Sequence, residues 1–200
     1  MKLSKKDLEI KLSKLEPLRK PKNELEQYST DSVLASEILN LAFANGDIAG
    51  KKVLDAGSGN GIFSYGSIYF GARFVTALEI DKDQEEVLKK NLNDLKNVEI
   101  VIGDIRKIDG HWDTVICNTP FGSVIRDSDL PFLENIFRIG DFIYLIHNWK
   151  VKDFVLEFLR NRATVLAYTK KKLIIPRIYA HHEKDRATID VLLLYAKRLE

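Results

Sequence analysis

The sequence of 200 residues contains a single cysteine, Cys117, and no long hydrophobic run. One cysteine excludes an internal disulfide and a multi-cysteine metal site, and it suits a reducing compartment. No apolar stretch approaches the roughly 18 residues of a membrane span, and the lysine-rich N-terminus lacks the apolar core of a secretory signal. We therefore expect a cytoplasmic protein with no membrane contact and no bound metal.

Hydrophobic residues make up 45% of the chain and charged residues 30%, which suits one soluble domain that buries roughly 70% of its unfolded surface. The net charge of +2 is unevenly distributed: residues 1–27 carry +3, residues 28–150 carry −6 and residues 151–200 carry +5. We expect a single domain, 1–200, with a basic N-terminal extension (1–27) before the core that carries the functional site (28–200). Basic ends would attract a polyanion, although ordinary lysine-rich surface explains them equally well.

Apolar strands alternate with helical patterns through most of the chain. The predicted strands are residues 52–56, 74–78, 98–102, 114–117 and 141–146. The predicted helices that follow them are residues 62–70, 82–95, 130–137 and 151–160. Strands without a polar face, separated by helices, indicate a parallel sheet covered on both sides.

The last fifty residues break this alternation. Residues 163–169 and 188–195 have strand patterns with no helix between them, and we expect an antiparallel edge hairpin with Pro176 in its long loop. The predicted fold is therefore α/β, with a doubly wound, Rossmann-like, mostly parallel sheet of seven strands that ends in an antiparallel hairpin.

The loop from Asp55 to Gly61, Asp-Ala-Gly-Ser-Gly-Asn-Gly, lies between a predicted strand and a predicted helix. Glycine lets the backbone turn sharply and approach a ligand, and the first turn of a doubly wound sheet binds nucleotide-like ligands. The spacing Gly57-x-Gly59-x-Gly61 differs from the dinucleotide fingerprint, because position 62 is isoleucine. This difference, and the acidic residue before the loop, favour a ligand with an ammonium and a sulfonium group.

Acidic residues also follow the next two predicted strands. Glu79, followed by Ile80, lies where a carboxylate can bind ribose hydroxyls, and Asp104, followed by Ile105, is placed to meet an adenine amine. Each alone is usually a helix cap or a solvated turn residue. Together the three strand ends predict an S-adenosylmethionine site formed by Asp55, Gly57, Gly59, Gly61, Glu79, Ile80, Asp104 and Ile105.

The turn Asn118-Thr119-Pro120-Phe121 follows the apolar strand 114–117. The amide oxygen of Asn118 and the carbonyl of Thr119 can accept both hydrogens of an exocyclic amine, and the Phe121 ring can stack on a heterocycle. Beside a methyl donor, such a pocket points to methylation of an amine. These four residues are the catalytic candidates, and Asn118 is also expected to face the cofactor.

The glycine loop and this turn resemble the class I amino-methyltransferases, whose acceptor motif is usually Asn or Asp, then Pro, Pro and an aromatic residue. The segment Leu-Glu-Gln-Tyr-Ser-Thr, residues 25–30, resembles the methyltransferase-like protein 5 family, and the similarity extends to about Leu194. The resemblance implies N6-methylation of adenosine in small-subunit ribosomal RNA, with S-adenosylmethionine as cofactor. It also implies an adenine pocket lined by Asn118, Pro120 and Phe121, and closure over the methionine end of the cofactor by Gln27, Tyr28 and Thr30.

Thr119 departs from the family pattern, which has proline at that position. The backbone carbonyl remains an acceptor whatever the side chain, and the residue before Pro120 is already biased toward extended geometry. We therefore expect a less rigid pocket that is still active. Cys117 and His147 are expected to be structural residues of their strands.

Two partners are implied by the resemblance, ribosomal RNA and a small zinc-binding activator protein that adds a strand to a sheet edge. His182, Lys171 and Lys172 are candidate RNA contacts, although solvent-facing loop and strand-end positions explain them nearly as well. Two other functions stay open. One is methylation of a glutamine amide in a protein, and the other is cofactor binding by a ribosome assembly factor that has lost catalysis.

Overall fold

The computed structural model describes residues 4–120, 130–176 and 186–199, and its main feature is one mixed β-sheet. The strand order is β3-β2-β1-β4-β5-β7-β6. The strands are β1 (Lys52–Ala56), β2 (Phe74–Glu79), β3 (Val98–Ile102), β4 (Trp112–Asn118), β5 (Gly140–Asn148), β6 (Ala163–Pro176) and β7 (Arg186–Arg198). The first five run parallel, and β7 runs antiparallel to both β5 and β6. The prediction of a seven-stranded, mostly parallel sheet with an antiparallel C-terminal hairpin is confirmed.

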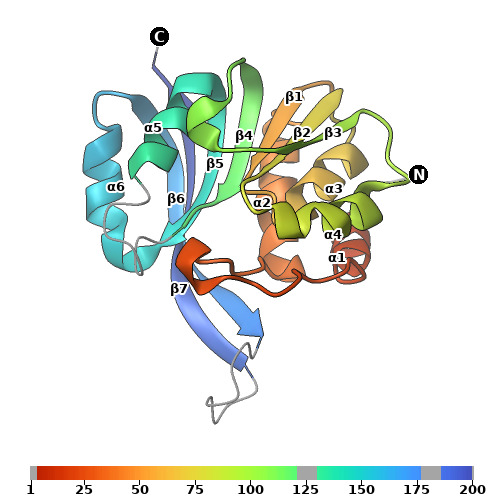
Figure 1. The fold of residues 1–200 in the computed structure, drawn as a ribbon. Coiled ribbons are helices and arrows are strands. Elements are labelled where there is room, and N and C mark those ends of the chain that lie inside the picture. Colours follow the sequence, from red (N-terminus) through yellow and green to blue (C-terminus); the bar gives the residue numbers. More distant parts are fainter. Residues whose placement is uncertain (1–3, 121–129, 177–185, 200) are drawn as a thin grey trace.

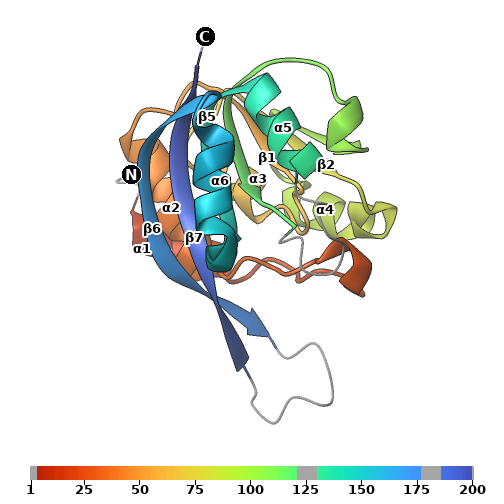
Figure 2. The ribbon, with the colours of Figure 1, turned by 90° about the vertical axis from the view of Figure 1, so that its left-hand side faces the viewer.

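Helices cover both faces of the sheet (Figures 1 and 2). The α-helices are α1 (Lys5–Leu12), α2 (Ser32–Ala44), α3 (Ile62–Tyr69), α4 (Glu85–Leu92), α5 (Leu130–Ile139) and α6 (Lys152–Leu159). The 3₁₀ turns are η1 (Asn23–Leu25), η2 (Lys82–Gln84), η3 (Ile105–Lys107) and η4 (Trp149–Val151). Helices α1 to α4 lie on one face and α5 and α6 on the other. In the described part of the chain, none of the helices combines the length and the apolar character needed to cross a membrane.

The C-terminal hairpin is longer than predicted. Its ladder runs from the pair Ala163–Arg198 to the pair Pro176–Arg186, so Pro176 ends a strand and does not lie in the loop. Proline is tolerated there because it removes a ladder hydrogen bond only at the outer end of an edge strand. The far end of the hairpin projects beyond the body of the molecule (Figure 2).

Residues of the N-terminal segment also pack into the core. Leu8 and Leu12 of α1 are buried against α2 and α3. Beyond α1 the chain crosses the carboxyl edge of the parallel strands (Figure 1). There the carbonyl of Glu16 accepts hydrogen bonds from the side chains of Asn60 and Asn91, both at 3.0 Å. The segment between α1 and α2 is therefore fixed where it can form one wall of a site.

Candidate active site

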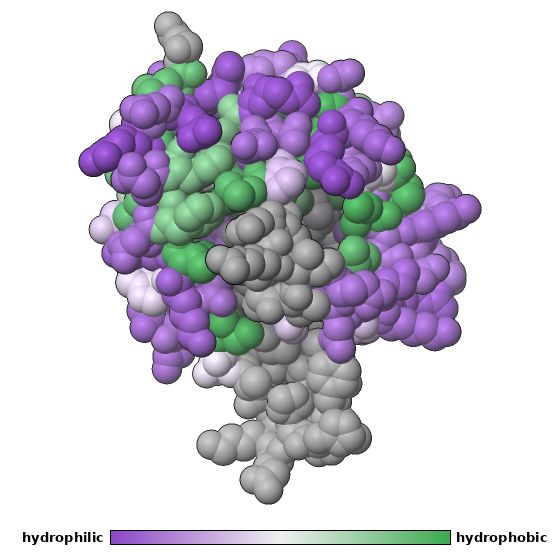
Figure 3. Space-filling model, turned by 60° about the vertical axis from the view of Figure 1, so that its left-hand side comes forward, coloured by the Kyte–Doolittle hydropathy of each residue, from purple (hydrophilic) through white to green (hydrophobic). Residues whose placement is uncertain are grey.

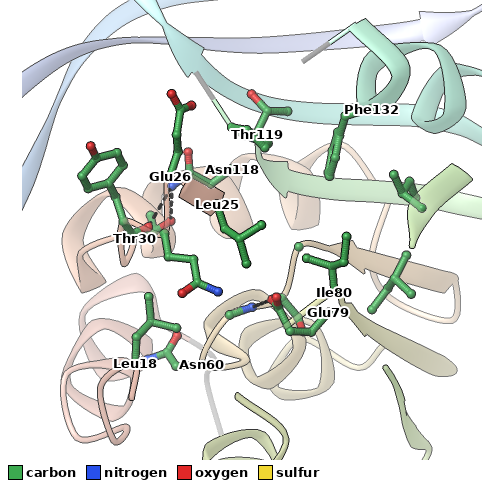
Figure 4. Close-up of a pocket in the computed structure, with 18 of the residues that line it drawn as sticks. Leu18, Leu25, Glu26, Thr30, Asn60, Glu79, Ile80, Asn118, Thr119 and Phe132 are labelled. Carbon is green, nitrogen blue, oxygen red and sulfur yellow. Dashed lines mark hydrogen bonds between the residues drawn. The ribbon is translucent and has the colours of Figure 1, made fainter. Parts of the chain in front are cut away.

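A cavity of about 570 Å³ opens at the carboxyl edge of the parallel strands. The turns after β1, β2, β3 and β4 line one side, and residues 24–30 line the other. Figure 4 shows Glu79 and Ile80 across the cavity from Glu26 and Thr30. The cavity lies where the strand order reverses, between β1 and β4, which is the usual ligand site of a doubly wound sheet. Its volume is within the roughly 300–1,000 Å³ of small-molecule sites.

The glycine loop between β1 and α3 brings its backbone to the cavity. Gly57, Gly59 and Gly61 have φ angles of 72°, 55° and 83°, in the left-handed region that favours glycine. The N–H of Gly57 donates to the carbonyl of Leu78 (2.9 Å) and holds the loop on β2. Gly57 and Gly59 line the cavity, whereas Gly61 caps α3 behind it. A Cβ at Gly61 would lie 3.1 Å from Leu92, so α4 packs closely there.

Asp55 is fully buried beneath this loop and does not line the cavity. Its Oδ2 accepts hydrogen bonds from the N–H (2.8 Å) and the hydroxyl (2.7 Å) of Ser64. Its Oδ1 has no partner among the described residues. Burial raises the pKa of Asp55 to about 7, and the charge of Glu79 acts in the same direction against the hydrogen bonds from Ser64. Direct cofactor contact by Asp55 therefore stays a prediction.

Glu79 is held by the backbone on both sides of its carboxylate. Oε2 accepts from the N–H of Gly59 (2.7 Å), and Oε1 accepts from the N–H of Asp81 (2.9 Å). Burial raises the pKa of Glu79 although these bonds oppose the shift. Each carboxylate oxygen retains a further acceptor site, so Glu79 can bind a ribose hydroxyl from its fixed position. Ile80 is 52% exposed and adds an apolar side chain to the wall.

Asp104 also lines the cavity, next to the buried Ile105. Its carboxylate caps η3 by accepting from the N–H of Arg106 (2.9 Å) and forms an ion pair with the guanidinium of the same residue. The hydrogen bond from the Arg106 side chain lowers the pKa of Asp104, against the effect of burial. No motif marked Arg106 in the sequence, although a basic residue two positions after a capping aspartate was a usable signal.

The N-terminal wall contains Gln27, Tyr28 and Thr30, all predicted to be cofactor residues. Gln27 donates from Nε2 to Asp81 Oδ2 (2.9 Å) and accepts at Oε1 from the N–H of Lys22 (2.8 Å). Lys22 Nζ also contacts Asp81 Oδ1 at 2.6 Å. Burial would raise the pKa of Asp81, but the hydrogen bonds from Lys22 and Gln27 lower it to about 2. The ionised carboxylate of Asp81 therefore connects the N-terminal wall to the end of β2 through its contacts with Lys22 and Gln27.

Asn118, the last residue of β4, connects the acceptor side of the cavity to this wall (Figure 4). Its Nδ2 donates to Thr30 Oγ1 (3.1 Å) and to the carbonyl of Tyr28 (3.4 Å). These two acceptors determine which end of the amide carries the hydrogens. The Oδ1 atom is buried and has no hydrogen-bond partner within the described ranges. Asn118 therefore lines the cavity with a fixed amide orientation, and its Oδ1 atom keeps its capacity to accept hydrogen bonds.

Thr119 and Pro120 continue the cavity wall after Asn118, and Phe121 lies outside the described residues. Thr119 donates from both its N–H and its hydroxyl to the carbonyl of Ile146 in β5, at 3.1 Å each. A proline at 119 has neither donor. Two hydrogen bonds to a central strand therefore hold the turn in place of the missing ring, which argues against the expected loss of rigidity.

Of the candidate RNA contacts, Lys171 and Lys172 project from opposite faces of β6. Lys171 forms an ion pair with Glu37 of α2 (2.8 Å), so it lies on the α2 side of β6. Lys172 is exposed and projects from the opposite face of the strand, because successive residues alternate. His182 lies outside the described ranges.

Two residues expected to be structural are buried. Cys117 donates to the carbonyl of Tyr144 (3.8 Å), and burial raises the pKa of its thiol far above the usual range. His147 is fully buried, and its Nδ1 accepts from the N–H of Asn148 (2.7 Å). Among the described residues, no group of three His, Cys, Asp or Glu side chains is arranged to hold a metal ion.

Two further apolar residues line the cavity without a sequence motif to mark them. The ring of Phe132, near the start of α5, lies 3.8 Å from the point where a Cβ on Gly57 would be. Leu18 lies 3.2 Å from the corresponding point on Gly59. Both side chains pack over the glycine loop, and the contact is tight only at Gly59.

The unpaired acceptors test whether S-adenosylmethionine suits this site. Asp55 Oδ1, Ser58 Oγ and Asn118 Oδ1 are buried without a partner in the described part of the chain. A buried polar atom without a partner costs about 1–3 kcal/mol. A ligand with ribose hydroxyls and an adenine amine carries hydrogen-bond donors that suit Asn118 Oδ1 and the carboxylates of Glu79 and Asp104, whose residues line the cavity. The hydrogen-bond acceptors of the site therefore match the donors of S-adenosylmethionine.

Several proteins that are similar to this chain in sequence and fold are named as methyltransferases. The family described as a methyltransferase domain matches residues 53–140. The rRNA N(6)-adenosine-methyltransferase Mettl5 of Drosophila melanogaster is 30% identical, over 76% of each chain. An uncharacterized protein of Methanocaldococcus jannaschii is 33% identical over 98% of this chain and 95% of its own. The crystal structure of a presumed RNA methyltransferase from Pyrococcus horikoshii is 38% identical and covers the whole of both chains with a TM-score of 0.92. The chain therefore belongs to the class I methyltransferases that use S-adenosylmethionine, in the group that contains methyltransferase-like protein 5.

Proposed function

We propose that this methyltransferase acts on the N6 amine of an unpaired adenosine in small-subunit ribosomal RNA. The observation that carries the proposal is the orientation of Asn118, whose Nδ2 is bound to Thr30 and Tyr28 while Oδ1 has no partner among the described residues. A fixed acceptor suits an amine with two hydrogens to donate. The name of the Drosophila relative, at 30% identity, supports the choice of adenosine in rRNA.

Hydrogen bonding explains how the chain would promote methyl transfer. The bound cofactor supplies an electrophilic methyl group on its sulfonium. Adenine N6 is a poor nucleophile because its lone pair is delocalised into the ring. Asn118 Oδ1 and the carbonyl of Thr119 would each accept one N–H, which favours the pyramidal nitrogen that develops as the N–C bond forms and the S–C bond breaks. The displaced proton becomes acidic only after transfer, so it can leave to solvent.

A target nucleotide has to leave its stack to reach this cavity. Stacking on an aromatic side chain contributes roughly 1–3 kcal/mol per base and offsets part of the unstacking cost. Phe121 is the residue we expect to supply it, from the same turn as Asn118. An adenosine that is already unpaired costs least to extrude.

One experiment separates this function from the two alternatives. The purified protein is incubated with isotopically labelled S-adenosylmethionine and small-subunit RNA or a translation factor, and products are identified by mass spectrometry. Labelled N6-methyladenosine in the RNA supports the proposal. Label on a glutamine of the translation factor would replace it with the protein-directed function. Cofactor binding without product on either would indicate an inactive assembly factor.

We further propose that the zinc-binding activator adds a strand at β3. This strand forms one edge of the sheet, and its apolar residues Val98, Ile100, Val101 and Ile102 are only half-buried. Exposed apolar edges are sites for strand addition. Ile100→Lys should abolish co-purification with a co-expressed activator and leave cofactor binding intact. Unchanged co-purification would place the activator elsewhere.

A further inference from the structure

Two aromatic rings and two lysines gather outside the cavity, where η4 meets β6. Lys152 Nζ lies 5.7 Å from the ring centre of Trp149 and 5.9 Å from that of Tyr168. Lys170 Nζ lies 5.6 Å from the ring centre of Trp149. All three separations are within the roughly 6 Å over which a cation is attracted to an aromatic face. We call these four residues the aromatic–lysine cluster.

The aromatic–lysine cluster lies at the same edge of the sheet as the cavity. Trp149 directly follows β5, whose Ile146 accepts the hydrogen bonds of Thr119. In β6, Tyr168 and Lys170 are paired with Leu194 and Leu192, which pack on the side of α5 and α6. Because Lys152 is the first residue of α6, the cluster lies where β5 ends and α6 begins, and Figure 2 shows these elements.

Tyr168 and Lys170 are the exposed members of the aromatic–lysine cluster, whereas Trp149 is partly buried and the Lys152 side chain is 24% exposed. Tyr168 is 49% exposed, and the Lys170 side chain is 48% exposed. Figure 3 shows this side of the molecule, where hydrophilic side chains surround smaller hydrophobic groups. Lys172 projects from the same face of β6 as Lys170, and Lys150 is exposed beside Trp149.

Acidic residues pair with both lysines of the cluster, but only at the surface. Lys152 contacts Asp153 and Lys170 contacts Asp190, each at 2.7 Å. Side-chain exposure is 91% for Asp153 and 48% for Asp190. Exposed ion pairs contribute little to stability, so a phosphate can take the place of either carboxylate.

We propose that the aromatic–lysine cluster binds the RNA strand next to the target adenosine. A neighbouring base stacks on Tyr168 or Trp149, and its phosphates contact Lys152 and Lys170. Single-stranded nucleic acids are bound by this combination of exposed aromatic rings and cationic side chains. The proposal rests on the proposed function, because it continues the path of an RNA whose adenosine occupies the cavity.

The test uses two RNA hairpins with the target adenosine unpaired, one with single-stranded flanks and one without. Tyr168→Ala removes a stacking ring, and Tyr168→Phe keeps it. Lys170→Gln removes one positive charge from the cluster. Lys197→Gln is the control, because Lys197 is also exposed but pairs with Thr164 at the other end of the hairpin. RNA dissociation constants are measured over a series of salt concentrations, and S-adenosylhomocysteine affinity checks that each variant is folded.

Tyr168→Ala should weaken binding of the flanked RNA about 5- to 150-fold, with a much smaller effect on the RNA without flanks, and Tyr168→Phe should bind like wild type. Lys170→Gln should reduce the slope of log affinity against log salt by about 0.7, and Lys197→Gln should leave it unchanged. Wild-type affinity and slope in both Tyr168→Ala and Lys170→Gln would overturn the proposal. A wild-type protein that binds RNA through the cluster but methylates none would instead overturn the proposed function.

Discussion

The donor half of the cavity contains the turns after β1, β2 and β3, where the methyl donor is expected, and the acceptor half contains the turn after β4. The contacts that build the two halves differ in how far apart their residues lie in the sequence. In the donor half, Gly59 donates to Glu79 and Gly57 to Leu78, so neighbouring turns fix one another. In the acceptor half, the orientation of Asn118 depends on Thr30, which lies 88 positions earlier in the chain. The donor half is therefore a local product of the βαβ fold, and the acceptor half requires the N-terminal wall to be in place.

The largest expected effect on activity comes from a substitution in the acceptor half. Asn118→Ala removes the acceptor for the developing charge on the amine, and kcat/KM should fall about 100- to 1,000-fold, as for loss of one hydrogen-bonding group aimed at a transition state. Cofactor affinity, measured by calorimetry, should change far less. Asn118→Asp keeps an oxygen acceptor and should retain part of the activity. Wild-type turnover in Asn118→Ala would show that the amide has no part in the reaction.

The next prediction concerns Asp55 in the donor half, whose folded pKa is about 7 against an ordinary value of 3.8. Because the folded protein favours the protonated form, the stability contribution of this group is complete below about pH 4 and is lost as the pH rises to about 7. The free energy of unfolding should therefore fall relative to Asp55→Asn, by up to about 1.4 kcal/mol per pH unit.

Chemical denaturation of the wild type and Asp55→Asn between pH 4 and 8 measures this difference. Saturating cofactor should reduce it, because a nearby ammonium group favours the ionised carboxylate. Stability curves of the two proteins that run parallel across this pH range would contradict a raised pKa.

Two glycine variants sharpen the contrast within the donor loop. Gly59→Ala forces a Cβ onto a left-handed residue that lines the cavity, a strain of about 1–2 kcal/mol, and cofactor affinity should fall roughly tenfold. Gly61→Ala meets similar strain behind the cavity and should lower the unfolding temperature with less effect on affinity. Calorimetry and thermal unfolding of both variants provide the comparison. Equal losses of affinity would mean that Gly61 also contacts the ligand.

The smallest effect concerns the link between the two walls. Thr30→Val removes the hydroxyl that accepts from Asn118 Nδ2, and a lost hydrogen bond of about 1 kcal/mol should lower kcat roughly fivefold. Thr30→Ser keeps the acceptor and should match wild type. Single-turnover kinetics with saturating cofactor isolate this step. If Thr30→Val and Thr30→Ser react at the same rate, Thr30 does not orient the amide.

Local patterns were sufficient to predict the donor half from sequence. A strand, a glycine loop and a helix place Gly57 and Gly59 at the carboxyl edge whatever the rest of the chain does, and Glu79 and Asp104 follow from the ends of the next two strands. The alternation of apolar strands and helices likewise predicted the parallel part of the sheet.

Features that depend on distant contacts could not be read from the sequence. The lysines at 171 and 172 suggested a strand end, but β6 continues through them because it stays paired with β7 as far as Pro176. The basic residues before position 27 suggested an extension, although Leu8 and Leu12 are buried in the core. The Thr30–Asn118 hydrogen bond was equally invisible, because no short motif encodes it.

The most direct test of the central claim is a crystal structure of the protein with S-adenosylhomocysteine and an adenosine-containing RNA. The amide oxygen of Asn118 should lie about 3 Å from adenine N6, with its nitrogen still bound to Thr30. An adenine whose N6 faces away from Asn118, or an amide turned so that Nδ2 meets the base, would contradict the account.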